Sequence, residues 1–527
     1  MARRKGLTLA EVHAALFETD SESEESGASE AGSFDSVEQD AFEDGLDVIL
    51  DKEVVRTLCT HTNLYAAKRK AAGYRGRWKD VVPEDILHFI SLVIYKGLSK
   101  TPAARDMWRK HRLYNMKFAK SVMPGYRFEA IEALLHMSNP ADDEVNDQLR
   151  GQPGFDGLGH LTDQILDACR AYYHPWKNLC VDERVVATKA RISMKMYNKD
   201  KPSKWGYKLF VLADSSNGYT CDFDIYEGKA RTPSGQGLSY DSVVNLLRVA
   251  YLGTGYAIYV DNFYTSAKLF LHLHSIGFAA CGTIRENRLG FPRTTVNALP
   301  KRAARVDMRW KRNGPLLFVK WRDTRDVTMC STLHKAFADN TCTRRVKDQR
   351  TGVWSTRRFT IPEPVRAYNK YMGGVDLSDA LIKYFTVTQK TKRWYYKLFL
   401  HFVDIAVVNS FIIHKEMLMA RNERPLTQKA FREVLSCELA DVGQQQPRSP
   451  AETSSSSDEE EEAPQGCYPV TVTEPSSDPR KKATAGRRRC VLCQRKTLFM
   501  CRSCQVPLCI IVDRLCFTEW HDMQGAQ

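Results

Sequence analysis

The stretch GGVDLSDAL, residues 373–381, places two carboxylates, Asp376 and Asp379, three positions apart behind a glycine pair. If a helix begins here, both carboxylates lie on one face of it. An acidic first turn is also common at an ordinary helix start, because anions are favourable near the N-terminus of a helix. The stretch by itself therefore leaves two interpretations open, a helix cap and part of a metal site.

Two further aspartates are associated with apolar, strand-like segments. Asp182 lies inside LCVDERVV (179–186), and Asp261 ends the run AIYVD (257–261). Each alone could be a salt-bridge or capping residue. A carboxylate in an apolar strand is nevertheless costly unless it is paired or coordinated, and open α/β sheets place their sites at the carboxyl ends of strands. Both aspartates are therefore candidate site residues.

Asp182, Asp261 and Asp376 carry the ligand type that hard divalent cations such as Mg²⁺ or Mn²⁺ prefer. If they converge from two strands and one helix, they could hold two ions around a phosphodiester. One ion would activate the nucleophile and the other would stabilise the leaving oxygen. The sequence thus predicts a phosphoryl-transfer site.

A second set of candidate ligands is concentrated near the end of the chain. Two CxxC pairs close together predict zinc, since each pair supplies two thiolates at tetrahedral spacing. The expected ligands are Cys490, Cys493, Cys501, Cys504, Cys509, Cys516 and His521. Seven ligands complete one zinc site and leave a second site one ligand short. A cross-braced arrangement would group Cys490 and Cys493 with Cys509, and Cys501 and Cys504 with Cys516 and His521, with Asp513 as a candidate for the gap.

The segments around the strand aspartates have the pattern of a mixed α/β sheet. Three short β-rich runs are followed by helix, strand, helix and strand, which describes a sheet with helices on its faces. We expect the strands at 178–186, 207–214, 219–228, 256–264 and 279–284. Charged, exposed-looking strands over 291–362 interrupt this alternation and predict a β-rich insertion.

Helical periodicity dominates on both sides of the sheet region. It is clear in VPEDILHFISLVIYKGL (82–98) and returns from 373 through 391–420. The most apolar helix, around 396–413, is interrupted by polar residues, so we predict no membrane span there. Residues 441–489 are low-complexity acidic coil followed by basic clusters and predict a linker.

The chain has 527 residues and a formal charge of +14, which is unevenly distributed. Residues 20–51 hold 12 acids and no Lys or Arg, so the rest of the chain is strongly basic. A basic body predicts a polyanionic partner, nucleic acid first. The basic segments KTKRWYYK (390–397) and NKDKPSKWGYK (198–208) also interleave aromatic rings, a composition suited to DNA contacts, although a solvated face explains each equally well. Scattered cysteines with a terminal cluster indicate metal binding in a reducing compartment.

Several long, ordered motifs carry a family resemblance. NLCVDERVV, IYVDNFYTS, CGTIRENR and YNKYMGGVDLSDALIKYF, together with the cysteine region, resemble the piggyBac transposase family. The resemblance implies an RNase H-like catalytic core with a triad formed by Asp182, Asp261 and Asp376. Asp379 matches an additional acidic position that would assist cofactor binding.

The fold class implied is α/β, with the RNase H-like core carrying a β-rich insertion, an all-helical dimerisation and DNA-binding domain around it, and a small C-terminal zinc module. The expected boundaries are an acidic leader (1–45), a first helical part (46–178), the core (179–290), the insertion (291–362), the end of the core (363–385), a second helical part (386–440), the linker (441–489) and the zinc module (490–522).

The resemblance implies a cut-and-paste DNA transposase that cleaves double-stranded DNA at transposon ends, forms hairpins and joins them to a TTAA target, as a homodimer without membrane contact. The alternative is a domesticated descendant that binds DNA or chromatin without transposing, and a plain nuclease is a third reading. The presence of all three aspartates favours the enzyme. Basic clusters at 480–489 predict nuclear localisation, and serines beside acids in the leader suit an acidophilic kinase.

Overall fold

The structure is a computed structural model that describes two parts of the chain. The first is 52–443, without 102, 112, 113, 115, 144–160, 193, 200–203, 229–233, 296, 297, 348, 349 and 392. The second comprises 469–471, 488–497, 499–501, 504, 506–510 and 516–525. The chain divides into two compact units, Met1–Gln444 and Gln445–Gln527, and each is described by itself.

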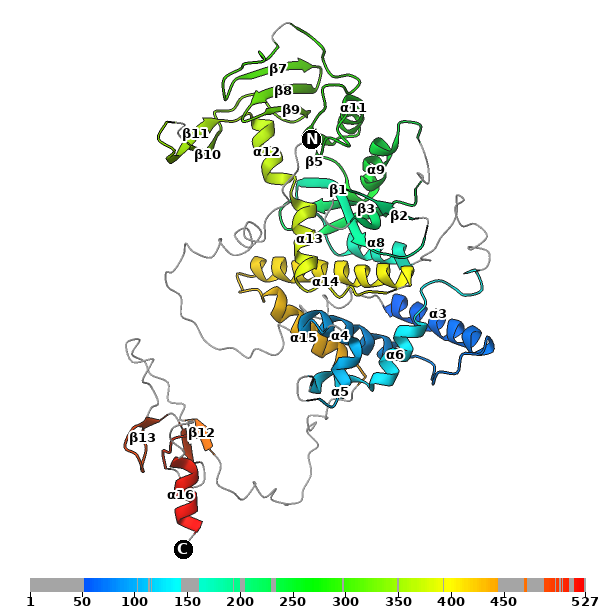
Figure 1. Cartoon of the computed structure of the whole chain (residues 1–527), viewed down its shortest axis with the longest axis vertical. Coiled ribbons are helices and arrows are strands. Elements are labelled where there is room, and N and C mark those ends of the chain that lie inside the picture. Colours follow the sequence, from blue (N-terminus) through cyan, green and yellow to red (C-terminus); the bar gives the residue numbers. More distant parts are fainter. Residues whose placement is uncertain are drawn as a thin grey trace, which may run out of the picture. The chain divides into compact units, whose positions relative to one another are not determined.

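The centre of the first unit is a nine-stranded mixed sheet with the order β2-β3-β1-β5-β6-β9-β8-β7, and β4 pairs with β3 beside β2 (Figure 1). Its first strands are antiparallel neighbours, whereas β1, β5 and β6 run parallel. The bounds are β1 Asn178–Ala187, β2 Lys195–Tyr197, β3 Trp205–Asp214, β4 Thr220–Ile225, β5 Ala257–Val260 and β6 Ala279–Thr283. These elements confirm the mixed α/β pattern that the sequence predicted.

Strands from the 291–362 region extend the same sheet. β9 (Asp326–Ser331) pairs antiparallel with β6, and β8 (Leu316–Arg322) and β7 (Met308–Asn313) follow. β10 (Thr341–Lys347) and β11 (Trp354–Thr360) instead form a separate two-stranded ribbon. The charged strands expected here exist, and three of them share the backbone hydrogen bonds of the central sheet.

The rest of the first unit consists of helices that precede or follow the sheet strands along the chain. Before it come α3 Lys52–Ala71, α4 Pro83–Ser99, the 3₁₀ helix η2 Ala104–Trp108, α5 Lys117–Val122, α6 Gly125–Leu134 and α8 Leu161–Ala171. After the ribbon come α12 Glu363–Tyr371, α13 Gly374–Tyr384, α14 Trp394–Ala420 and α15 Gln428–Asp441. α15 packs on α4, so helices far apart in the sequence form one helical body (Figure 1).

α14 is the long helix that lies between the sheet and the helical body (Figure 1). Its length and composition would allow it to cross a membrane, but 94% of its most apolar window is buried inside the protein. Asn409 on α14 bonds the backbone N–H and C=O of Thr220 on β4, both at 3.0 Å. Asn409 therefore fixes this helix to β4.

Three shorter helices complete the packing around the strands. α9 (Leu238–Leu246) contacts β3 and β4, while α10 (Val249–Leu252) follows it, and α11 (Ala267–Ser275) contacts β6 and β8. α12 contacts β1, β6 and β9, and α13 contacts β1 and β3. These contacts place α13, with its two aspartates, against the strand that carries Asp182.

The second unit is small and held by short elements. β12 (Pro469–Thr471) pairs with β15 (Phe499–Cys501), and β13 (Arg488–Arg489) pairs with β14 (Lys496–Thr497). The helix α16 spans Cys516–Gly525. Its buried core consists of Leu508 and four cysteines, with a few half-buried apolar residues around them. β12 lies in the range that the sequence predicted to be linker.

Candidate active site and cysteine centre

The parallel pair β1 and β5 brings the first two aspartates together. Val181 on β1 is in register with Val260 on β5, and each valine is followed directly by an aspartate, Asp182 and Asp261. Since neighbouring strands lie about 4.8 Å apart, the two aspartates occupy adjacent positions. Both are half-buried, and Asp261 Oδ1 accepts a hydrogen bond from the backbone N–H of Phe263 at 2.7 Å.

Contacts above and below Asp182 show which face of β1 it occupies. Cys180, two residues earlier, lies against the backbone N–H groups of Gly374 and Val375, and burial raises its pKa to about 12. Arg184, two residues later, donates from Nη2 to Ser378 Oγ at 2.8 Å. Because side chains alternate along a strand, Asp182 faces α13 between these two contacts.

The first turn of α13 therefore lies opposite Asp182, and this turn contains Asp376, whose side chain is exposed. The close approach requires Gly374. A Cβ at that position would lie 2.7 Å from Cys180 Sγ and 2.8 Å from the carbonyl oxygen of Asp214. The glycine that precedes the acidic motif is thus explained by packing of the helix onto the strand.

The helix start predicted at the glycine pair is confirmed, but capping by an aspartate is wrong. The N-cap is Gly373, and no side chain accepts a capping hydrogen bond there. Asp376 occupies the third helical position instead, where its charge suits the helix N-terminus.

Asp379 makes a structural contact. Arg184 Nε donates to Asp379 Oδ1 at 2.6 Å, and the Arg184 side chain is only 2% exposed. The same guanidinium bonds Ser378, so it attaches α13 to β1 at two points. Arg184 was not among the predicted site residues, although its place two residues after Asp182 puts it on the same strand face.

The three aspartates are not among the groups whose ligand atoms all lie within 4.8 Å of one another. In the described parts of the chain those groups consist of cysteines and one histidine of the second unit. The fold instead places the aspartates near one another on one side of the sheet. The register of β1 and β5 places Asp182 beside Asp261, and the packing of α13 on β1 brings Asp376 to the same side. Carboxylates from two strands and one helix are suited to Mg²⁺ or Mn²⁺.

Two further cations lie beside Asp261 and were not singled out from the sequence. Arg285 donates from Nη2 to Asn262 Oδ1 at 3.0 Å, and Arg288 donates to the carbonyl oxygen of Asn262 at 3.2 Å. Both belong to the motif CGTIRENR, and Arg285 is exposed. The sequence signal that could have identified them is their position directly after β6, the strand that neighbours β5.

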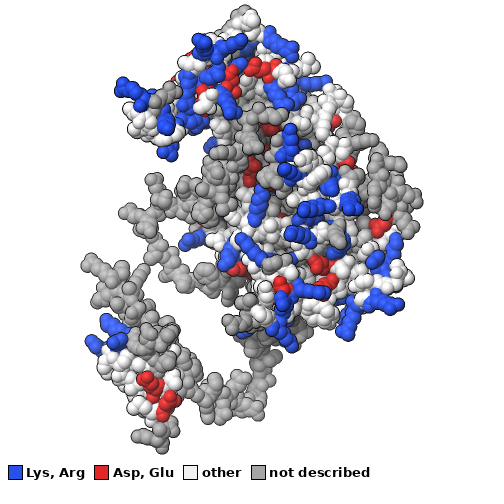
Figure 2. Space-filling model, viewed as in Figure 1, with Lys and Arg blue, Asp and Glu red and all other residues white. Residues whose placement is uncertain are grey.

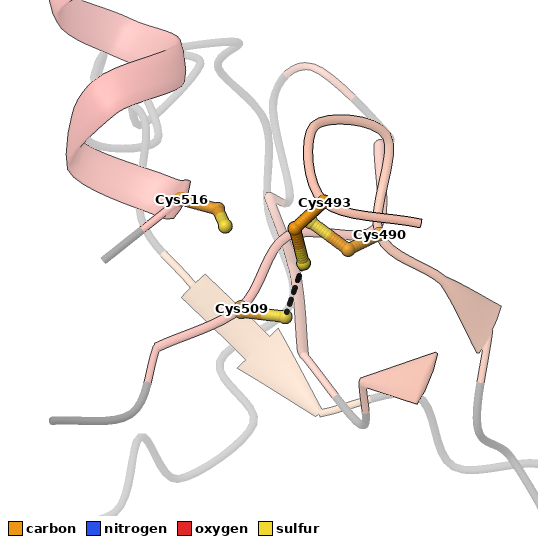
Figure 3. Close-up of side chains that lie close together, drawn as sticks. All are labelled: Cys490, Cys493, Cys509 and Cys516. Atoms are coloured by element: carbon orange, nitrogen blue, oxygen red, sulfur yellow. Dashed lines mark hydrogen bonds between the residues drawn. The ribbon is translucent and has the colours of Figure 1, made fainter. Parts of the chain in front are cut away.

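The cysteine centre of the second unit contains a four-thiol group, Cys490, Cys493, Cys509 and Cys516 (Figure 3). Cys493 Sγ and Cys509 Sγ are 3.6 Å apart. The backbone N–H of Arg495 lowers the pKa of Cys493 to about 6, so this thiol ionises readily. Four thiols within one small core match the ligand set of a structural zinc site.

A second group contains Cys501, Cys504 and His521. His521 Nε2 is 3.4 Å from Cys504 Sγ, while Nδ1 lies 2.7 Å from the carbonyl oxygen of Phe517. A carbonyl at Nδ1 holds the proton there and leaves Nε2 to face the thiols, as in histidine–zinc sites.

The structure corrects the expected grouping of Cys516. Cys516 belongs with the first group, although the sequence grouped it with His521. Both residues are on α16, five positions apart, and such positions are separated by about 7.5 Å along a helix and face different directions. Asp513, the candidate for the missing ligand, lies outside the described residues.

The basic–aromatic segment at 390–397 is mainly structural. Arg393 donates to the carbonyl oxygens of Glu132 and Ala133. Tyr396 is buried, and Lys397 donates to the carbonyl oxygen of Gln389 at 3.1 Å. In the other segment Tyr207 is buried and Lys208 pairs with Glu183, whereas Trp205 stays half exposed beneath Lys195.

A basic groove of about 1330 Å³ lies between the helical body and the segment that follows α13. Glu129 and Glu132 are its acidic lining residues, and Arg105 pairs with Glu129. The cations along it are Arg77, Lys96, Lys100, Arg105, Lys383 and Lys390. The groove therefore has a net positive lining.

Comparisons with known proteins identify the class. A family model described as Transposase IS4 matches residues 44–411, well over half of the chain. Human PiggyBac transposable element-derived protein 3 is 24% identical over 490 residues, which cover 90% of this chain and 75% of that protein. Human PiggyBac transposable element-derived protein 2 is 22% identical over 398 residues, covering 74% of this chain and 64% of that protein.

A solved structure shows the same fold. The cryo-EM structure of the piggyBac transposase synaptic complex with hairpin DNA has a TM-score of 0.65 and 22% identity, covering 89% of this chain and 95% of that one. The chain belongs to the piggyBac transposase family. The resemblance read from its motifs is confirmed.

Proposed function

We propose that this protein is a DNA transposase whose active site is formed by Asp182, Asp261 and Asp376. The observation that carries the proposal is the adjacent placement of Asp182 and Asp261 after the registered pair Val181 and Val260, on the face where α13 presents Asp376. We further propose that the core is RNase H-like. Support comes from the strand order β4-β3-β1-β5-β6, antiparallel in its first three strands and parallel afterwards.

In this proposal the three carboxylates hold Mg²⁺ or Mn²⁺. Bound cations would activate the attacking oxygen and stabilise the leaving oxygen of the phosphodiester. Arg184 and Asp379 position α13, and with it Asp376, relative to β1. Arg285 and Arg288 lie beside Asp261, where their charges suit the phosphates that flank the cleaved bond.

The finer steps of the reaction come from the family. They are cleavage at the transposon end, a hairpin intermediate and joining at a TTAA target, carried out by a homodimer on double-stranded DNA. The name of the solved relative refers to a synaptic complex with hairpin DNA. The groove cations, from Arg77 to Lys390, provide a positively charged surface suited to the phosphates of the duplex.

We propose that the second unit binds one or two zinc ions and adds DNA affinity through tethering to the first. Its two ligand groups, four thiols and two thiols with His521, support this. Nuclear localisation through the clusters at 480–482 and 487–489 is part of the same proposal, and Arg488 and Arg489 are exposed. Replacing all six basic residues with alanine should move the full chain out of the nucleus.

The central test compares four asparagine variants in a nicking assay on a duplex with TTAA-bounded inverted repeats from the source genome. D182N, D261N and D376N should each lose cleavage by at least about 10³-fold while DNA affinity and melting temperature stay near wild type. D379N changes an acid on the same helix that positions α13 through Arg184, so it should reduce cleavage less than the triad variants do. Nicking by any well-folded triad variant with Mg²⁺ present would refute the assignment.

A second candidate function is DNA binding without cleavage by a domesticated descendant. It is favoured by the human relatives, whose names describe transposable element-derived proteins. The same assay separates the two, since a domesticated binder would shift the duplex but leave it intact with Mg²⁺ or Mn²⁺.

A further inference from the structure

The ribbon formed by β10 and β11 has two chemically different faces. Its register pairs Thr341 with Thr360 and Lys347 with Trp354, so alternate residues on both strands share a face. One face, called the anchored face here, contains Cys342, Arg344, Val346, Ser355, Arg357 and Phe359. The opposite face, called the outer face, contains Thr341, Thr343, Arg345, Lys347, Trp354, Thr356, Arg358 and Thr360.

Contacts from the anchored face hold the ribbon on the first unit. The guanidinium of Arg305 stacks over the Phe359 ring at 4.2 Å and pairs with Asp323 at 2.5 Å. Arg344 lies 3.6 Å from the same carboxylate. Cys342 packs against the apolar core. The ribbon is thus fixed from one side, which determines the direction in which the other side points.

The outer face is exposed along its whole length. All eight residues on it are exposed, and the Trp354 side chain is 57% exposed with Arg345 stacked over it at 5.6 Å. The face has three cations, four hydroxyls and one aromatic ring, and none of its residues is acidic. An exposed surface that only keeps a protein soluble usually mixes both charge signs. Here the composition is that of a surface for a polyanion.

We propose that the outer face of this ribbon binds duplex DNA in the major groove. A two-stranded β-ribbon fits the groove, which is about 12 Å wide. Arg345, Lys347 and Arg358 supply phosphate or base-edge contacts, and the four threonine hydroxyls supply further donors. Figure 2 shows many Lys and Arg side chains, with some Asp and Glu among them, over the part of the molecule that contains β7 to β11. The assignment rests on the proposed function because it names an additional surface for the same DNA.

A short stretch of chain joins the ribbon to the helix that carries Asp376. β11 ends at Thr360, α12 spans Glu363–Tyr371, and α13 with Asp376 follows directly. α12 is about 14 Å long at 1.5 Å per residue. A duplex turn is about 34 Å, so the ribbon reaches DNA within roughly one turn of the cleaved phosphate. Contacts at that distance would orient the duplex without touching the reacting atoms.

The test uses the full chain and two neighbouring arginines on β11. R358A removes a cation from the outer face, and R357A removes one from the anchored face, where Arg357 is also exposed. Affinity for the transposon-end duplex is measured without Mg²⁺ at several salt concentrations. R358A should lower the salt slope by about 1 and R345A/K347A/R358A by about 3, with at least a 10-fold loss of affinity for the triple variant. R357A should bind within about twofold of wild type.

Methylation of guanine N7, which occupies the major groove, gives the second measurement. Wild type should show interference at guanines within about one turn of the cleaved phosphate, and the triple variant should lose it. The proposal would be overturned if R357A and R358A had equal effects, or if the triple variant showed the same interference as wild type. It would also be overturned if the triple variant lost affinity for RNA or an acidic peptide while its affinity for DNA was unchanged. If wild type does not cleave but the R357A–R358A contrast persists, the proposed function fails and the ribbon assignment stands.

Discussion

The two candidate metal centres of this protein are supported in opposite ways. Asp182 and Asp261 lie at neighbouring strands of a nine-stranded sheet, and Asp376 lies on α13, which is held to β1 by Arg184 and by the close contact at Gly374. The cysteines are themselves most of the buried core of their unit, together with Leu508. If a metal ligand is removed from a site on an independently folded domain, activity is lost but the domain stays folded. If the ligands themselves form the core, removing one unfolds the domain.

The sharpest contrast is expected from removal of metal. A chelator, or Cys490→Ser, should unfold the second unit, because structural zinc supplies about 10–16 kcal/mol of apparent binding free energy in small domains. Limited proteolysis should then cleave 469–525 at least about 100 times faster while the first unit keeps its resistance. Cys437→Ser, an exposed cysteine on α15, is the control and should change neither rate. Protease resistance of the second unit in chelator would refute the comparison.

Within the first unit, the largest effect on stability is expected from Arg184→Met. The substitution leaves Asp379 without its ion-pair partner and removes one hydrogen bond to Ser378, whose Oγ still bonds Thr220 Oγ1. Breaking a largely buried ion pair costs about 2–3 kcal/mol when one side is partly exposed. Cleavage should fall as well, since α13 carries Asp376. Urea unfolding checks the first effect. Lys208→Met breaks a pair whose cation is 18% exposed, against 2% for Arg184, so it should cost less than about 1 kcal/mol. An equal cost would show that Arg184 has no special role.

Much of the scaffold could be predicted from sequence because strand and helix periodicities were strong. The strands around Asp182 and Asp261 and the helix start at the glycine pair follow from local patterns. So does the choice of the six cysteines and one histidine that the structure brings into two groups. The continuation of the sheet from β6 to β9 did not follow, because pairing between distant strands leaves no local signal. The placement of Cys516 depended on the direction of α16, which spacing alone does not give.

The rule that a carboxylate in an apolar strand indicates function proved too broad. Asp214 at the end of β3 is fully buried, yet it accepts hydrogen bonds from Tyr173, Trp176 and Ser216 and so is structural. Asp222 on β4 pairs with Arg170 at 2.9 Å. What distinguishes Asp182 is its adjacency to Asp261 across β1 and β5, which requires the register and not the residue type.

Gly374→Ala would sharpen the comparison by changing packing without touching a ligand. The added Cβ would lie under 3 Å from Cys180 Sγ and from the carbonyl oxygen of Asp214, so α13 must shift. Overpacking of this kind costs about 1–3 kcal/mol, and cleavage should fall through displacement of Asp376. Gly373→Ala is the neighbouring control, because its φ of −85° is open to any residue. Unchanged cleavage by G374A would mean that the docking of α13 does not position the site.

The smallest predicted effect concerns pH, to which the stabilities of the two units should respond in opposite directions. In the first unit the expected change in the free energy of unfolding is about 1 kcal/mol. Burial raises the pKa of Asp222 from its usual 3.8 to about 6, although Arg170 and Arg248 act against this. Between these two values the folded protein holds a proton that the unfolded chain has released, so this group stabilises the fold at low pH. That contribution is lost as pH rises through about 6.

From pH 5 to pH 7 the loss amounts to about 1 kcal/mol, because one pKa unit corresponds to about 1.4 kcal/mol and only the upper part of the titration lies in this range. Asp222→Asn should remove this dependence, so the stability of the variant relative to wild type should rise by that amount from pH 5 to pH 7. The second unit should respond with the opposite sign, since acid protonates the thiolates and releases zinc. Urea unfolding of the first unit and zinc release from the second, followed in the same chain, measure both. The comparison would fail if the second unit kept its zinc at pH 5. It would also fail if the stability of D222N had the same pH dependence as wild type, because the first unit would then not differ from the second in the way that its packing predicts.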